Sequence, residues 1–175
     1  MKKLILLLFI PLLSIGQDYR AYIADKSYPS TKFYKLEGDK QDINLSFVKT
    51  EIGFAVLLKT HYYFNPHIED VLIRKKLSLF LSNGDVINSE KTSANDYEDE
   101  SLISLYPITE TDIAKLIVHN LNRVRYTISV TDKFVSASKD INRTATTNDT
   151  TIDAALEKLL GDEEDVKRLV DKLNY

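Results

Sequence analysis

Hydrophobic and polar positions alternate along the middle of the chain, most clearly from Ile52 to Phe64. The even-numbered positions from Phe54 to Phe64 are apolar or aromatic apart from Thr60, and the odd-numbered ones turn polar towards His61 and Tyr63. Successive side chains of a strand point to opposite faces, so this period of two predicts a β-strand. Its apolar face predicts the central strand of a core.

Similar but shorter runs predict further strands, at residues 19–24, 32–36, 43–48, 77–81, 86–88, 102–105 and 123–131. Residues 71–81 also fit a helical pattern through Ile73, Leu77, Phe80 and Leu81. Asn83-Gly84 favours a strand there, because this pair between apolar runs is typical of a tight hairpin turn. We therefore expect 77–81 and 86–88 to pair. Residues 25–31, which contain Pro29, and the acidic residues 89–100 are predicted to be a turn and a loop.

Helical signals occur in two places. Thr109 and Asp112 have the spacing of a capping box, and an apolar stripe follows them up to about residue 121. Near the C-terminus, residues 152–160 end at Gly161, with Thr151 or Asp149 as the expected cap. Asp162 is then expected to cap a last helix at 163–173. These features predict one mid-chain helix and a C-terminal helical hairpin.

Many short, half-polar strands favour a mostly β protein of the α+β type, and in particular an antiparallel β-sandwich that is immunoglobulin-like in general architecture. The expected organisation is a signal peptide at 1–16, a β-sandwich domain at 17–135, a polar linker at 136–151 and the helical hairpin at 152–175. A chain of 175 residues suits one folded core.

The N-terminus has the pattern of a secretory signal peptide. Lys2 and Lys3 precede an apolar run from Leu4 to Leu13, and small residues lead to an expected cleavage after Gly16. The apolar run is shorter than the roughly 20 residues of a transmembrane helix. We therefore expect export to the periplasm or the extracellular space, with no transmembrane anchor after cleavage.

Composition limits the expected partners. The chain has no cysteine, which excludes disulfides and favours a bacterial source for a small exported protein. A net charge of -3 argues against nucleic acid as a partner. The signal ending in Gly16-Gln17, the chain length and the strand spacing resemble small uncharacterised exported β-sandwich proteins of Bacteroidetes-type bacteria. This resemblance implies export and general fold, and it assigns no functional residue.

Three side chains near the end of the central strand form the candidate ligand-binding patch: His61, Tyr63 and His67. Their rings could stack on a ligand, whereas the other interpretation is a strand end with exposed amphipathic side chains. The histidine spacing is not that of metal ligands, and no metal or cofactor is predicted. The basic spots at 74–76 and at Arg123 and Arg125 suit a phosphate or an anionic polysaccharide, or are solvated strand faces.

Catalytic motifs are absent from the sequence, which lacks G-x-S-x-G, HExxH, G-x-G-x-x-G and any cysteine nucleophile. Ser136 and Lys139 match Ser-x-x-Lys without its companion motifs, so we interpret the match as chance. The sequence favours a non-enzymatic binding or structural domain of the bacterial cell envelope with an unknown protein or glycan partner. The alternative is an envelope- or carbohydrate-acting hydrolase with its site near His61 to His67. The oligomeric state is not predicted.

Overall fold

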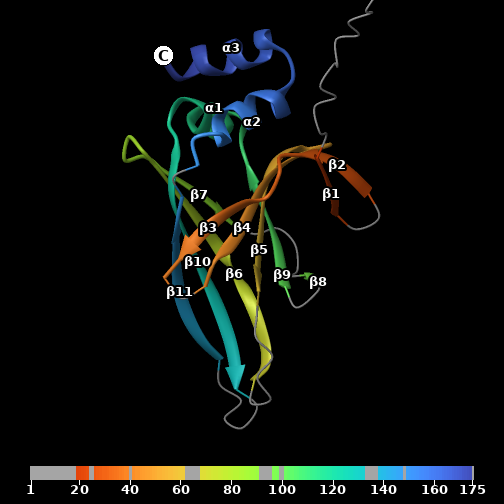
Figure 1. Cartoon of the computed structure of the whole chain (residues 1–175), viewed down its shortest axis with the longest axis vertical. Helices are drawn as coiled ribbons and strands as arrows, with labels where there is room; N and C mark the ends of the chain where they lie inside the picture. Colours follow the sequence, from red (N-terminus) through yellow and green to blue (C-terminus); the bar gives the residue numbers. More distant parts are fainter. Residues whose placement is uncertain are drawn as a thin grey trace, which may run out of the picture.

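The computed structural model describes residues 19–23, 26–39, 41–61, 68–90, 96–98, 101–132, 138–147 and 149–174 (Figure 1). The signal peptide predicted at 1–16 lies outside these residues. The strands they form are β1 (Tyr19–Ile23), β2 (Lys26–Ser30), β3 (Tyr34–Gly38), β4 (Ile43–Thr50), β5 (Gly53–His61), β6 (Ile68–Leu81), β7 (Val86–Glu90), β8 (Asp96–Glu98), β9 (Ser101–Ile108), β10 (Leu121–Asp132) and β11 (Ser138–Thr146). The helices are α1 (Glu110–Val118), α2 (Ile152–Leu160), α3 (Glu163–Asp171) and the short 3-10 helix η1 (Lys172–Asn174).

The strands form one open sheet in the order β7-β6-β10-β11-β3-β4-β5-β9-β8. The pairings between its described strands are antiparallel. The β1–β2 hairpin lies off this path and joins β4 at Ser30 and Val48. The prediction of a mostly antiparallel β protein with helices is therefore confirmed. The immunoglobulin-like sandwich stays a prediction.

The strand β5 is central in its half of the sheet, as its alternation predicts for residues 53–61. It pairs with β4 on one side and with β9 on the other. Phe54, Val56 and Leu58 pack into the main core, which also contains residues of β6, β10 and the helices. Leu57 points the other way, into a small second cluster with Ala21 of the β1–β2 hairpin. The hairpin thus covers part of the outer side of this half.

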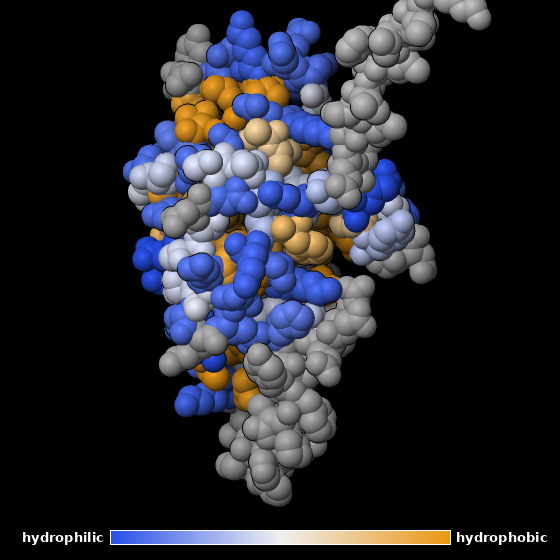
Figure 2. All heavy atoms as spheres, viewed as in Figure 1, coloured by the Kyte–Doolittle hydropathy of each residue, from blue (hydrophilic) through white to orange (hydrophobic). Residues whose placement is uncertain are grey.

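The three α-helices lie together at one end of the sheet (Figure 1). The capping box of α1 is confirmed, because Thr109 and Asp112 exchange both of its hydrogen bonds. The C-terminal helices pack onto the main core through Ile152, Leu156 and Leu169. Figure 2 shows hydrophobic side chains between the hydrophilic outer surface of this end and the largely hydrophilic sheet. No helix in the described ranges is long and apolar enough to cross a membrane.

The linker predicted at 136–151 is wrong over residues 138–146, which form β11. This strand pairs with β10 along its whole length, from Ser138 opposite Thr131 to Thr146 opposite Arg123. Its side chains are mostly polar, so hydrophobic alternation is weak. β11 pairs with β10 on one side and with β3 on the other, and these strands supply hydrogen-bond partners for its backbone groups. The segment therefore forms a strand despite its polar side chains.

Two further strands occupy segments predicted as connections. Residues 26–30 form β2, where the sequence predicts a turn, and 96–98 form β8 within the predicted loop at 89–100. The strand β9 is also longer than the strand predicted at 102–105, because it continues through Pro107 to Ile108. Among the described residues, β8 pairs with β9 only as far as Ile103, so no described strand on that side needs a proline N–H at position 107.

Candidate functional site

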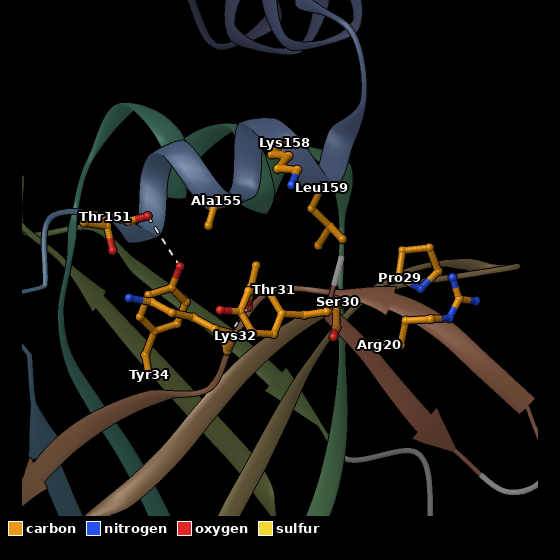
Figure 3. Close-up of a pocket in the computed structure, with 11 residues that line it drawn as sticks. Arg20, Pro29, Ser30, Thr31, Lys32, Tyr34, Thr151, Ala155, Lys158 and Leu159 are labelled. Atoms are coloured by element: carbon orange, nitrogen blue, oxygen red, sulfur yellow. Dashed lines mark hydrogen bonds between the residues drawn. The ribbon is translucent and has the colours of Figure 1, made fainter. Parts of the chain in front are cut away.

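A cleft lies between the β1–β2 hairpin, the start of β3 and helix α2 (Figure 3). Its volume of about 430 Å³ is within the range of pockets that hold small molecules. Segments more than a hundred residues apart build it, since the hairpin and β3 form one wall and α2 forms the other. The lining residues are Tyr19, Arg20, Pro29, Ser30, Thr31, Lys32, Tyr34, Thr151, Ala155, Lys158 and Leu159.

The wall between β2 and β3 is held in place by hydrogen bonds to β4. Thr31 is buried, and its N–H donates to the carbonyl of Phe47 at 2.9 Å. Its Oγ1 accepts from the Phe47 N–H at 3.0 Å, and the hydroxyl of Ser46 donates to the Thr31 carbonyl at 2.9 Å. These bonds determine where the chain leaves the hairpin and enters β3.

Helix α2 forms the opposite wall and is anchored at both ends. Before it, the carboxylate of Asp149 accepts from the hydroxyl of Thr151 at 2.6 Å and from its N–H at 2.9 Å. The bond from the hydroxyl is the largest cause of the lowered pKa of Asp149. At the other end, Lys49 Nζ donates to the carbonyl of Leu160 at 2.7 Å, where a helix terminus favours a cation.

The floor of the cleft is Tyr34, whose side chain points from β3 towards α2 (Figure 3). The residue is 1% exposed, and its hydroxyl donates to the Thr151 carbonyl at 3.4 Å. Burial raises the pKa of Tyr34 to about 12, because the phenolate would lose its hydration. The floor therefore stays uncharged at neutral pH. Lys32 Nζ lies 4.9 Å from the centre of its ring.

The lining is basic. It includes Arg20, Lys32 and Lys158, and no residue of the lining is a carboxylate. Just outside the cleft, Asp149 lies 3.7 Å from Lys32 Nζ and balances one of these charges. Arg20 reaches Ser27 through Nε and one terminal nitrogen, which orients its guanidinium along the hairpin. The cleft thus combines aromatic surface with positive charge.

The comparisons with known proteins come to a negative result. No family model, curated protein or solved structure matches the chain. The chemistry of the cleft is therefore inferred from its own residues.

Of the predicted site residues, His61 is described, whereas Tyr63 and His67 lie outside the described part of the chain. His61 is exposed at the end of β5 away from the helices. Its Nδ1 lies 3.2 Å from the hydroxyl of Ser101, and its carbonyl accepts from the side chain of Gln41. Within the described residues, no carboxylate is hydrogen-bonded to its ring. The Asp42 carboxylate near His61 forms an ion pair with Lys35 at 2.8 Å. The hydrogen bond from Lys35 is the largest cause of the lowered pKa of Asp42.

Sequence reasoning missed the cleft. Residues 26–30 read as a turn, and nothing local shows that α2 returns to the hairpin. The available signal was composition, since Tyr19, Tyr22, Tyr28 and Tyr34 make the N-terminal segment rich in tyrosine. Their pattern identified strands and did not identify a binding surface.

Proposed function

We propose that the chain is an exported, non-enzymatic binding domain of a bacterial cell envelope, and that its ligand occupies the cleft between the β1–β2 hairpin and α2. The ligand is a small molecule with an anionic group and a ring. The observation that carries this proposal is the basic lining around the buried ring of Tyr34, with no carboxylate in that lining. Cationic side chains pair with a carboxylate, and the ring of Tyr19, which is 41% exposed, offers apolar surface for a ring to stack on.

Binding is favoured over catalysis by the chemistry of the lining. Its titratable groups are Tyr, Lys and Arg, whose usual pKa values lie at about 10 or above. A general base works best with a pKa near the working pH, so this set is better suited to holding an anion than to abstracting a proton.

The hydrolase alternative at His61 has weaker support. The described partner of its ring is the hydroxyl of Ser101, and Ser101 is 0% exposed. A nucleophilic hydroxyl must reach the substrate, and a buried one does not. We therefore place the ligand in the cleft.

The proposal also extends to architecture. We propose that the halves β7-β6-β10-β11 and β3-β4-β5-β9-β8 face each other as an immunoglobulin-like sandwich. In support, Leu77 and Val124 of one half share the main core with Val56 and Leu58 of the other.

The test uses the chain from Gln17 onward, labelled with 15N, and two anions that carry a ring, D-glucuronate and benzoate. We expect at least one of them to shift the amide signals of Lys32 and Ala155, with D-glucose binding about tenfold or more weakly because it lacks the charge. Ala155→Phe fills the cleft and should abolish the shifts. Ala154→Phe is the control, since Ala154 is exposed on the same helix. Absence of shifts with both anions, or shifts that survive Ala155→Phe, would contradict the proposal.

A further inference from the structure

The outer face of the half-sheet β7-β6-β10-β11 carries a second group of cations, separate from the cleft. Val124 and Tyr126 of β10 are buried in the core. Arg123 and Arg125 alternate with them along the strand and therefore point to the opposite, outer face. Pairing places Phe80 beside Arg123 and Ser78 beside Arg125 on the same face. These side chains form what we call the arginine face, together with Val86, Asn88, Asn142, Thr144 and Thr146.

Both arginines are held against one aromatic ring. The guanidinium carbon of Arg123 lies 4.4 Å from the centre of the Phe80 ring, and that of Arg125 lies 5.3 Å from it. Stacking on a ring orients a guanidinium and removes part of its hydration. The two positive charges are thus fixed near each other before any ligand arrives.

Neither arginine is neutralised by a neighbour in the described part of the chain. The ion pairs between described residues involve other side chains. The Nε atom of Arg123 is also buried without a hydrogen-bond partner. An unpaired buried donor is costly, and a ligand on the surface does not reach this atom. An anion that pairs with the other nitrogens of the two guanidinium groups supplies the negative charge that they lack.

The neighbouring amides add further donors. The hydroxyl of Ser78 donates to Asn88 Oδ1 at 2.7 Å, and that of Thr127 donates to Asn142 Oδ1 at 2.8 Å. Each of these hydrogen bonds orients an amide through its oxygen, and the NH2 groups of Asn88 and Asn142 can then donate to a ligand. Donors therefore extend across the strands from β7 to β11. Carboxylates of this face, Glu90 and Asp140, lie at its margins.

We propose that the arginine face binds an anionic polysaccharide that lies across the strands. Its carboxylate or sulfate groups pair with Arg123 and Arg125, and its hydroxyls accept from the two asparagine amides. A repeating sugar chain suits donors spread over four neighbouring strands better than one small anion does. An acidic peptide fits less well, since the groups that this face presents are side-chain donors, whereas an extended peptide pairs with the backbone of a strand edge.

The test is affinity electrophoresis of the chain from Gln17 onward in native gels that contain polygalacturonate, dextran sulfate, neutral dextran or poly-L-glutamate. The first two separate carboxylate from sulfate as the recognised group. We expect retardation by at least one of them and none by dextran. Arg125→Gln, at an exposed position, should weaken retention about tenfold, which corresponds to the loss of one charge-assisted hydrogen bond. Asn88→Ala should weaken it to a lesser extent.

The control is Lys167→Gln, which removes the same charge from the exposed side of α3 and should leave retention unchanged. The inference is overturned by absence of retardation in both anionic polysaccharides, by equal losses in Lys167→Gln and Arg125→Gln, or by stronger retention in poly-L-glutamate. Ala155→Phe separates the two sites, because it should abolish small-anion binding in the cleft and leave polymer retention intact.

Discussion

Burial determines the acid–base behaviour of the core tyrosines Tyr34, Tyr106 and Tyr126. Desolvation is the first cause of the raised pKa in each of them. For Tyr34 and Tyr126, a hydrogen bond to the side chain of Thr151 or of Thr60 works in the opposite direction and reduces the shift. Their hydroxyls therefore remain neutral donors well above neutral pH, and the positive lining of the cleft is not offset by a phenolate.

Tyr34 gives a prediction for alkaline pH. Its pKa is about 12 in the folded chain against an ordinary value of 10.0, so the folded state holds this proton more tightly. The resulting stability is fully present below pH 10 and is lost as pH rises towards about 12. Tyr34→Phe should cost about 0.5–1 kcal/mol at pH 8, because one long hydrogen bond is lost. Its disadvantage relative to wild type should shrink at pH 11.

Urea unfolding followed by circular dichroism at the two pH values measures this difference. Tyr22→Phe is the matched control, since Tyr22 is 78% exposed and its substitution should cost little at either pH. A Tyr34→Phe penalty that stays constant or grows from pH 8 to pH 11 would show that burial does not raise this pKa.

Elements with local signals were predictable from the sequence, and those defined by distant partners were not. The turn at Asn83-Gly84 has Gly84 at a φ of +92°, and Asp162 caps α3 by accepting from the Asp165 N–H at 2.9 Å. The residue types alone predict both the turn and the cap. By contrast, β11 consists largely of polar residues, and its strand state depends on β10. The cleft was missed for the same reason, because α2 and the β1–β2 hairpin meet only in the folded chain.

Gly161 lies in the short connection between α2 and α3, and its substitution tests how much this connection contributes to stability. Its φ is +127°, a conformation that side chains with a Cβ rarely adopt, although a Cβ there would meet no atom within 4 Å. Gly161→Ala should therefore destabilise the chain by about 1–3 kcal/mol, with backbone strain rather than a steric clash as the cause. The loss should include the packing of Leu169, which α3 buries in the core. Chemical denaturation measures it, with Glu164→Ala on the exposed side of α3 as the control; equal stability of the two variants would contradict the prediction.

At the scale of the whole molecule, the two halves of the sheet are joined by a short contact. The described pairs between β3 and β11 are Gly38 with Ala145 and Glu37 with Thr146. The N–H of Asp39 adds a hydrogen bond to the Thr144 carbonyl at 3.1 Å. Beyond this junction the halves meet through the main core and through contacts such as Ser89 Oγ with the Pro107 carbonyl at 2.5 Å. The mostly antiparallel β class was predictable from the alternation of apolar and polar residues. No such pattern in the sequence predicts the contact between β3 and β11.

Gly38 lies at this junction and leaves no room for a side chain. A Cβ added to it would overlap the backbone carbonyl of Gln41, and a backbone atom has no alternative rotamer by which to move away. Gly38→Ala should therefore destabilise the chain by about 3 kcal/mol, at the upper end for overpacking. Because the strain falls on β3, the amides of Ala145 and Thr146 should lose more protection from hydrogen exchange than amides in β5. Glu37→Ala, at the neighbouring exposed position, should change little. If Gly38→Ala unfolds at the wild-type urea concentration, or if protection falls evenly across both halves, then the β3–β11 contact is not what couples them.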